Sequence, residues 1–222
     1  MDAIKCGKVE MTMKIEEQVA MLEVDKKTAN VYSNGIKRNM DVIVAAIAFV
    51  VVCPIIILFC MLTIMESKGS PIFLQRRIGI HGKSFYIIKI RSMKKDAEKD
   101  GPQWANENDP RVTKIGRFIR KTRIDELPQL INVVIGDMSL VGPRPEREVF
   151  IEKFESEIPG FSKRLQVKPG LTGWAQVHGG YNLSPHQKLR YDLFYIRNQS
   201  MILDLKIMMK TCKVILTGNG AR

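Results

Sequence analysis

The longest apolar segment of the chain runs from Val42 to Met65, 24 residues without a charge. A straight helix of that length would reach about 36 Å, enough to cross a hydrocarbon core of about 30 Å. Pro54 stands near its middle, where it removes a backbone hydrogen bond and favours a kink. Each flank of fifteen residues carries three Lys or Arg residues, so the positive-inside rule favours neither direction of crossing. A spanning helix and a re-entrant helix broken at Pro54 both stay open.

Shorter patterns after residue 66 predict a domain of the α+β class, mainly helical with a small sheet. Ile72–Leu74 and Phe85–Ile88 flank a turn at Gly79–Gly82 like the strands of a short β-hairpin. Apolar residues at helical spacing predict helices at about 113–123, 126–135, 145–158, 185–196 and 201–217.

The last predicted helix carries Lys206, Lys210 and Lys213 on an otherwise apolar surface. Such a helix is typical of the membrane interface, where lysines reach the phosphates, and also of an ordinary helix packed on a core. The sequence thus predicts a cytosolic N-terminal extension at 1–35, a membrane segment at 36–66, and a compact cytosolic domain at 67–222 with interfacial amphipathic helices.

Composition and charge narrow the class of protein. Hydrophobic residues make up 45% of the chain, which is enough to exclude an intrinsically disordered protein. The four cysteines are scattered, so neither a disulfide framework nor a zinc cluster is indicated. Lys and Arg number 35 against 23 Asp and Glu, and the net charge of +12 indicates an anionic partner. Nucleic acid, anionic lipid and nucleotide phosphates all meet that description.

The densest group of charged residues precedes Pro128. Pro128 fits best in the first turn of a following helix, which puts Asp125 and Glu126 at the N-terminus of the helix predicted there. The helix dipole would keep Asp125 ionised and able to attack phosphorus or hold a divalent cation. The cations that would neutralise a pyrophosphate are Arg117, Arg120, Lys121 and Arg123. The alternative is a capping pair beside a solvated basic helix.

Two further motifs are rich in proline and glycine. Pro143 and Pro145 hold Arg144 in an extended segment, suited to a nucleotide phosphate or base or simply to an exposed tight loop. In Lys168-Pro-Gly-Leu-Thr-Gly-Trp174 the glycines permit close backbone approach, and the tryptophan could stack on a ligand ring or pack in the core. The sequence has no Walker loop, no Gly-x-Ser-x-Gly elbow and no histidines at metal-ligand spacing.

Taken in order, these motifs resemble those of the bacterial sugar transferases, the monotopic phosphoglycosyl transferase family, from about Lys37 to Leu216. The motifs that carry the resemblance are Lys37-Arg38-x-x-Asp41, Gln75-x-Arg77-x-Gly79, Lys89-Ile-Arg91-Ser-Met93, Asp125-Glu126-Leu-Pro-Gln129, Gly136-Asp-Met-Ser-Leu-Val-Gly-Pro-Arg-Pro145, Lys168-Pro-Gly-Leu-Thr-Gly-Trp-Ala-Gln-Val177 and Asp192-Leu-Phe-Tyr-Ile-x-Asn198.

The resemblance implies a reaction. Members of this family attack the β-phosphate of a UDP-sugar with the Asp of an Asp-Glu dyad and release UMP. They then pass the phosphosugar from the covalent aspartyl intermediate to undecaprenyl phosphate, with Mg²⁺ bound. The nucleophile and metal ligand here would be Asp125, with Glu126 as its dyad partner. The residues carried over to substrate binding are Arg120, Arg144, Lys89, Arg91 and Asp192.

The family's membrane helix is re-entrant and breaks at a Ser-Pro pair. The resemblance therefore favours the re-entrant form here, although Cys53 replaces the serine before the proline. The residues assigned to this membrane segment are Lys37, Arg38, Asp41 and Pro54.

A second departure from the family pattern follows Val177. Here His178-Gly-Gly-Tyr181-Asn182 replaces the Asn-Gly-Arg of many relatives, so no arginine is carried over at that point. Larger relatives have a multi-span N-terminal extension, and its absence here suggests a minimal catalytic unit.

The sequence leaves three functional hypotheses. The first is a phosphoglycosyl transferase at the cytoplasmic face of the bacterial cell membrane that performs the first membrane step of a polysaccharide or glycoprotein glycan. The second is a catalytically silent membrane-anchored module that recruits glycan-assembly enzymes. The third is an anchored nucleic-acid binder, which only the net charge supports. We expect membrane lipids but no nucleic acid as partners, because acids are interspersed and base-stacking motifs are missing. Homodimer formation and the identity of the sugar are left open.

Overall fold

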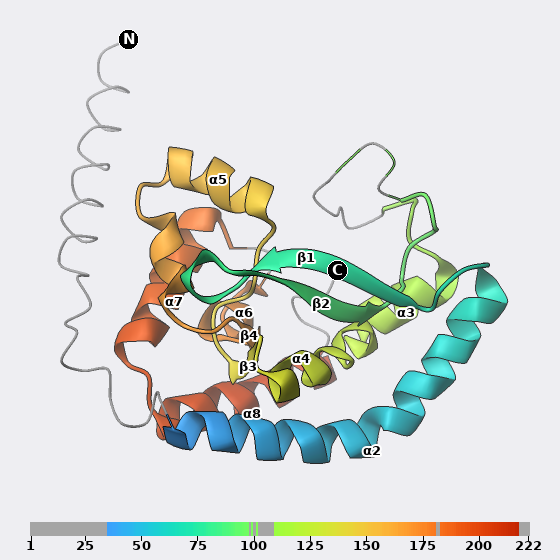
Figure 1. The fold of residues 1–222 in the computed structure, drawn as a ribbon, viewed down its shortest axis with the longest axis horizontal. Helices are drawn as coiled ribbons and strands as arrows, with labels where there is room; N and C mark the ends of the chain where they lie inside the picture. The colour runs from blue at the N-terminus through green and yellow to red at the C-terminus, as the bar shows by residue number, and fades with distance from the viewer. Residues whose placement is uncertain (1–34, 98, 100, 102–108, 181–182, 218–222) are drawn as a thin grey trace, which may run out of the picture.

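The computed structural model describes residues 35–97, 99, 101, 109–180 and 183–217. Most of the expected N-terminal extension, and Tyr181 and Asn182, lie outside these residues. Figure 1 shows a long helix beneath shorter helices that surround a β-hairpin. The helices are α2 (Lys37–Glu66), α3 (Lys114–Lys121), α4 (Gln129–Ile135), α5 (Glu148–Glu157), α6 (Trp174–Val177), α7 (Pro185–Arg197) and α8 (Met201–Thr217). The strands are β1 (Ile72–Ile78), β2 (Ser84–Ile90), β3 (Ser139–Val141) and β4 (Gly170–Thr172). The 3₁₀ helices are η3 (Ile80–Gly82), η4 (Ile124–Glu126) and η5 (Phe161–Gln166).

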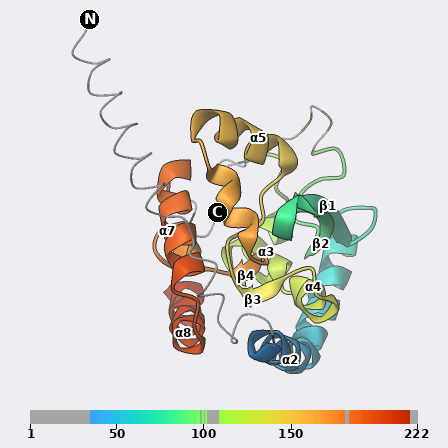
Figure 2. The same cartoon turned by 60° about the vertical axis from the view of Figure 1, so that its left-hand side comes forward.

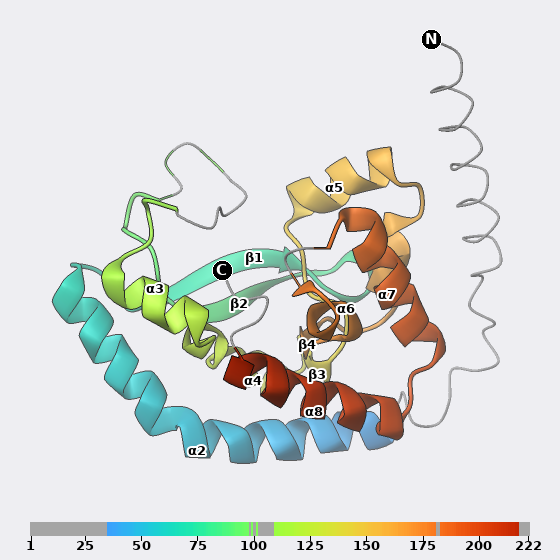
Figure 3. The same ribbon diagram turned by 180° about the vertical axis from the view of Figure 1, so that it is seen from behind.

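Helix α2 lies along the domain, and it bends near its middle so that its halves follow two sides of the molecule (Figures 1 and 3). Pro54 lies inside the helix and is the expected cause of the bend. Ala45 and Ile56 are buried against the domain, whereas Val50 and Val51 are 72% and 70% exposed. One apolar face of α2 is therefore left uncovered by protein. In the described part of the chain, α2 is the one helix long and apolar enough to cross a membrane.

The start of α2 is bound to three elements of the domain. Lys37 pairs with Asp204 of α8. Arg38 donates to two carbonyl oxygens at the end of α4, at 2.6 and 2.8 Å. Asp41 accepts hydrogen bonds from the Ser139 hydroxyl at 2.7 Å and from the next backbone N–H at 3.2 Å. These charged residues, assigned to the membrane segment from the sequence, thus contact the protein, and Lys37 and Asp41 are buried.

The end of α2 is bound to the same domain. The Glu66 carboxylate accepts from the first two backbone N–H groups of α3, at 2.7 and 3.0 Å. Arg91, directly after β2, donates to the carbonyl oxygens of Ser67 and Lys68, at 2.6 and 2.9 Å. Both ends of this 30-residue helix therefore lie on one domain.

The hairpin forms the middle layer of the molecule. Strands β1 and β2 pair antiparallel from Ile72↔Ile90 to Ile78↔Ser84. Figure 2 shows α5 on one side of the hairpin and α2 on the other, with α4 close to α2. The buried residues that join the first half of α2 to α4 and β2 are Ala45, Ile87, Leu130, Val133 and Met138. The second half packs on β2 and α3 through Ile56, Ile90 and Ile119.

A second sheet, which the sequence did not predict, joins the two glycine-rich motifs. Strands β3 and β4 pair in parallel, with Ser139 opposite Gly170. A Cβ atom on Gly170 would lie 2.0 Å from the backbone nitrogen of Gly142, so a larger residue cannot fit. The close backbone approach predicted from these glycines is therefore between the two motifs themselves.

The predicted fold class is confirmed: the protein is α+β, mainly helical, with small sheets and one long apolar helix near the start of its described part. The hairpin and all five predicted helices of the domain are present, with shifted ends. The helix expected at 126–135 begins only at Gln129, because Asp125 and Glu126 form the separate 3₁₀ turn η4. The helix expected from Pro145 begins at Glu148.

Candidate active site

A cavity of about 450 Å³ opens between the hairpin, α3, η4 and the segment that follows β3. Twelve Lys or Arg residues line it, against three carboxylates: Asp125, Glu126 and Glu146. Such an excess of cations in a partly enclosed site attracts an anionic ligand. The size and charge of the cavity therefore suit a small molecule that carries several phosphate charges.

The turn between α3 and α4 brings the two adjacent acids into this cavity. Helix α3 ends at Lys121, and Arg123 then adopts a left-handed conformation with φ of 58°. A non-glycine residue in that region costs on the order of 1 kcal/mol or more, a cost often found at functional sites. Asp125 and Glu126 follow directly in η4 and are both buried, each 8% exposed.

Glu126 is surrounded by cations. Its carboxylate accepts hydrogen bonds from Arg144 and from Lys89, the latter at 3.4 Å, and lies 3.7 Å from Arg123 Nη1. Burial alone would raise the pKa of Glu126, but Arg144, Lys89 and Arg123 together hold its pKa well below the ordinary value. Glu126 is therefore ionised and fully engaged at neutral pH.

Asp125 behaves in the opposite way. Burial raises its pKa to about 6, and the negative charge of Glu126 adds to that effect, whereas Lys89, Arg120 and Arg144 oppose it. The sequence predicted that a helix dipole would keep this group ionised. Helix α4 starts only at Gln129, and burial raises the pKa, yet a group with a pKa of about 6 is still mostly ionised at pH 7.

The structure separates the cations that the sequence grouped together on α3. Arg120 and Arg123 line the cavity, as do Lys89 and Arg144. Arg117 and Lys121 are exposed and do not line it. Of the four cations expected to meet one pyrophosphate, the structure therefore places Arg120 and Arg123 at the cavity and leaves Arg117 and Lys121 on the exposed surface of α3.

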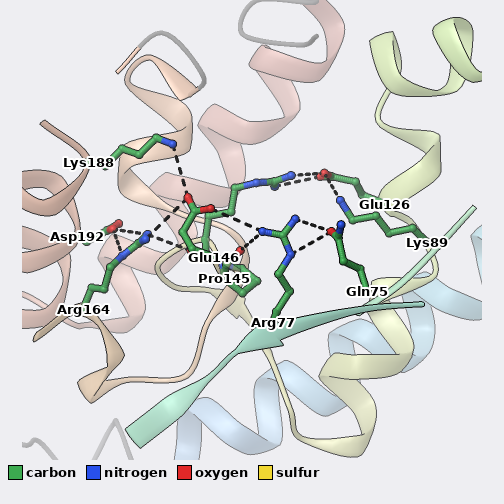
Figure 4. A network of polar contacts seen from close by, with 10 residues as sticks. Gln75, Arg77, Lys89, Glu126, Pro145, Glu146, Arg164, Lys188 and Asp192 are labelled. Atoms are coloured by element: carbon green, nitrogen blue, oxygen red, sulfur yellow. Dashed lines mark hydrogen bonds and ion pairs between the residues drawn. The ribbon is translucent and has the colours of Figure 1, made fainter. Parts of the chain in front are cut away.

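Glu146 is a buried acid that the sequence patterns did not single out. Its carboxylate lies 3.6 Å from Arg77 Nη1, 3.8 Å from Arg164 Nη1 and 3.6 Å from Lys188 Nζ (Figure 4). Burial would raise the pKa of Glu146, but Lys188, Arg164 and Arg77 lower it overall. Its position directly after Pro145 is the one sequence signal that could have identified it.

Asp192 lies behind the cavity. It is 1% exposed and does not line the cavity. It accepts a hydrogen bond from Arg164 Nε at 2.9 Å and lies 2.7 Å from Arg164 Nη2. Burial raises the pKa of Asp192, although Arg164 opposes the shift. Arg164 Nη2 also donates to the backbone carbonyl of Arg144 at 3.0 Å. Asp192 is thus connected through Arg164 to the residue that binds Glu126, and its direct contact with substrate stays a prediction.

Arg91 and Trp174 have contacts of their own. Arg91 lines the cavity, but two of its nitrogens bind the segment after α2, so it joins that segment to the site.

Trp174 stacks on Phe194 with centroids 5.4 Å apart, and Lys210 lies 4.8 Å from the Trp174 ring centre. Of the two interpretations of this tryptophan, packing is therefore the one that the contacts favour.

The donor set of the cavity suits a metal ion shared with a ligand. No group of three or more His, Cys, Asp or Glu side chains in the described ranges could hold a metal ion by itself. Mg²⁺ is commonly held by one or two carboxylates together with substrate phosphates. Both Glu126 oxygens already contact Arg144, and both Glu146 oxygens lie in ion pairs with cations, which leaves Asp125 as the available carboxylate. A cation beside Asp125 would also offset the cost of its ionisation.

The sequence pattern described as "Bacterial sugar transferase" matches residues 32–218. The chain is 47% identical over 190 residues to a UDP-N-acetylgalactosamine-undecaprenyl-phosphate N-acetylgalactosaminephosphotransferase of Aeromonas hydrophila, covering 84% of this chain and 45% of that protein. It is 39% identical over 181 residues to the UDP-glucose:undecaprenyl-phosphate glucose-1-phosphate transferase of Escherichia coli K12, covering 79% and 39%. A Caulobacter vibrioides protein of that same name is 40% identical over 192 residues, covering 83% and 71%. The chain thus spans less than half the length of the first two relatives.

Proposed function

The chain belongs to the bacterial sugar transferase family, and from that premise we propose that it transfers a sugar-1-phosphate from a UDP-sugar to undecaprenyl phosphate, releasing UMP. The reaction would begin the synthesis of a polysaccharide at the cytoplasmic face of the cell membrane. The observation that carries the proposal is a buried carboxylate, Asp125, whose pKa is raised to about 6 in a cavity lined by cations. Such a group is ionised at neutral pH, yet weakly solvated and therefore nucleophilic.

In the first step, a carboxylate oxygen of Asp125 attacks the β-phosphorus of the UDP-sugar. A bond forms between that oxygen and phosphorus, and the bond from phosphorus to the bridging oxygen breaks. UMP leaves with the bonding electrons as a phosphate anion, and the phosphosugar stays on Asp125. Arg120 and Arg123, which line the cavity near the dyad, would stabilise the charge that develops on the leaving phosphate.

In the second step, a phosphate oxygen of undecaprenyl phosphate attacks the same phosphorus. The aspartyl–phosphorus bond breaks, which restores the Asp125 carboxylate and forms the lipid diphosphate sugar. Atoms and charge balance without an oxidant or reductant. Glu126 acts as a positioning residue because its contacts with Arg144 and Lys89 hold two cations at the cavity.

We propose Mg²⁺ as the cofactor, which Asp125 and the phosphates of the donor would hold and which would neutralise phosphate charge.

Arg164 and Asp192 act as positioning residues. Their buried ion pair holds the backbone at Arg144, which lies between two prolines. A cavity kept in shape in this way binds the nucleotide in one orientation.

We also propose that α2 is re-entrant and dips into one leaflet with both ends on the cytoplasmic side. Support comes from the contacts at its ends. Asp41 binds Ser139 near the start of the helix, and Glu66 caps α3 at its end. A straight span would separate these positions by the bilayer thickness. The bend and the uncovered apolar face fit an insertion that leaves the domain at the surface.

The decisive experiment uses the protein in nanodiscs with Mg²⁺, undecaprenyl phosphate and a panel of UDP-sugars, with UMP and UDP measured separately. We expect lipid-dependent UMP from at least one donor, and a loss of about 10³-fold or more on Asp125→Asn, as for removal of a covalent nucleophile. Without the lipid, intact-mass spectrometry should show a phosphosugar adduct on the wild type alone. UDP as product would indicate ordinary glycosyl transfer, and no nucleotide from any donor would favour a silent anchored module.

A stability measurement separates lost chemistry from lost folding in Asp125→Asn. The fold raises the pKa of Asp125 from 3.8 to about 6, so the folded protein binds more protons than the unfolded chain between these values. Ionisation therefore costs stability as pH rises toward 6, and the full cost is present at pH 7. The neutral variant should unfold at the same or a higher temperature than the wild type at pH 7.

A further inference from the structure

Helix α3 presents different residues to the core, to the cavity and to the solvent. Ile119 faces the core and is fully buried. Arg120 lines the cavity. Lys114, Arg117 and Lys121 are exposed, and their spacing of three and four residues puts them on one face. We call these three residues the α3 cationic face.

The α3 cationic face lies between the cavity and the apolar surface of α2. At 100° per residue, Arg117 is adjacent to Arg120 around the helix, and Lys114 is adjacent to Phe118. Phe118 is 52% exposed and stacks on Phe59 of α2, with ring centroids 5.7 Å apart. Figures 1 and 3 show α3 beside the second half of α2.

The second half of α2, which lies beside α3 (Figure 1), also exposes apolar side chains. Ile57, Leu58 and Met61 are each about half exposed, at 53%, 48% and 52%. A ligand that touched both surfaces would need an anion joined to a long apolar chain. The backbone N–H groups at the start of α3 already bind the Glu66 carboxylate, so the cationic side chains are the groups that face such an anion.

We propose that the α3 cationic face receives the phosphate of the polyprenyl phosphate acceptor at the membrane surface and passes it to Arg120 at the cavity. The proposal rests on the proposed function and adds the route of the second substrate. The polyprenyl chain would remain beside α2 while the phosphate moves over one turn of α3. The UDP-sugar would not use this face, because it lies outside the cavity that binds the nucleotide.

The test separates the two half-reactions. The variant Lys114→Gln/Arg117→Gln/Lys121→Gln keeps polar, exposed side chains and should fold. In phosphatidylcholine vesicles, we expect its KM for undecaprenyl phosphate to rise about tenfold, as expected from losing three exposed ion contacts. Its KM for the UDP-sugar and its single-turnover release of UMP without lipid should stay unchanged. The charge-conserving variant Lys114→Arg/Arg117→Lys/Lys121→Arg should retain the wild-type KM.

A matched control on α8 distinguishes the acceptor from anionic bilayer lipid. Lys206→Gln/Lys210→Gln/Lys213→Gln removes the same number of charges, and it should leave the acceptor KM unchanged in phosphatidylcholine. Equal effects of the two triple variants, or an effect of the α3 variant only in phosphatidylglycerol vesicles, would mean general lipid attraction and overturn the proposal. An unchanged acceptor KM in the α3 variant, or loss of its single-turnover release of UMP without lipid, would overturn the proposal as well. Failure of the wild type to release UMP would instead refute the proposed function.

Discussion

Asp125 and Glu126 are neighbours in sequence and equally buried, yet their pKa values shift in opposite directions. The difference in pKa comes from the cations that contact each carboxylate. Glu126 has hydrogen bonds from Arg144 and Lys89, which offset its desolvation. Cations lower the pKa of Asp125 only through longer-range electrostatic attraction, and the negative charge of Glu126 raises it. Adjacent acids with separated pKa values are typical of sites where one acid reacts and the other holds neighbouring groups in position.

This coupling predicts the pH dependence of the reaction. Asp125 must be ionised to attack, so kcat/KM should rise about tenfold per pH unit below a pKa of about 6 and level off above it. The variant Glu126→Gln removes the negative charge that raises this pKa and leaves the cations in place. The rising part of the pH profile of kcat/KM, its acid limb, should therefore move to lower pH. The value of kcat/KM at its plateau should fall because Arg144 loses its ion-pair partner. The measurement is UMP release from pH 4.5 to 8.

The matched control for that profile is Glu148→Gln. Glu148 is an exposed acid paired with Arg76 on the outside of the molecule, and its removal should move neither the limb nor the plateau. An acid limb that stays in place in Glu126→Gln would show that Asp125 does not titrate in the observed range, which would contradict the electrostatic argument.

At the scale of elements, the position of Arg120 depends on how closely α3 approaches the chain beyond β2. Gly116 lies on the inner side of α3, and a Cβ atom there would come within 1.9 Å of the Ser92 carbonyl oxygen. The Thr113 hydroxyl accepts from Gly116 N–H and caps the helix, while Thr113 N–H donates to Ser92 O at 3.1 Å. The helix is therefore held against the backbone with no room for a side chain.

Gly116→Ala should force α3 outward and displace Arg120 from the cavity. Overpacking against backbone costs about 1 to 3 kcal/mol, which corresponds to a Tm lower by roughly 2 to 10 °C for a chain of this size. UMP release should fall together with Tm. The control Lys114→Ala, on the exposed side of the same helix, should leave Tm nearly unchanged. Equal melting temperatures for Gly116→Ala and the wild type would contradict the packing argument.

At the scale of the whole molecule, α2 and the domain form one body, in which Ile124 of η4, directly before Asp125, packs in one cluster with Ile56 of α2. The start of α2 binds α8, α4 and β3, and its end binds α3. Its uncovered face carries apolar side chains such as Val50 and Val51. This arrangement would hold the cavity near the membrane surface, where a lipid-borne phosphate and a soluble nucleotide can meet.

The re-entrant proposal predicts the accessibility of the two ends of α2. In a variant with its four native cysteines changed to serine, single cysteines are placed at Gly35→Cys or Lys68→Cys, both exposed. Neither should react with an impermeant maleimide in intact bacteria, and both should react after permeabilisation. Labelling of one of the two sites from outside the cell would establish a spanning helix and contradict the proposal.

Several features followed from the sequence because they depend on neighbouring residues. The long apolar run, the hairpin around Gly79–Gly82 and the later helices are local patterns, and the structure contains each of them. The Asp125-Glu126 pair and the arginine between two prolines were also identifiable as candidates, since charged residues beside helix-breaking residues stand out. Local propensity says little, however, about which side of a helix meets a cavity.

Long-range contacts decided the rest. The sequence could not separate Arg120 from Arg117, or identify Glu146 as the partner of Arg77, Arg164 and Lys188, because these contacts join segments far apart in the chain. It could not show that the pKa of Asp125 is raised, since desolvation depends on the tertiary packing around η4. The sequence by itself determined the longer helices, the hairpin, the net charge and the family, because these follow from residue order alone. The tertiary structure alone decided burial, ion pairing and the position of the site beside α2, because each depends on which distant side chains exclude water from the same place.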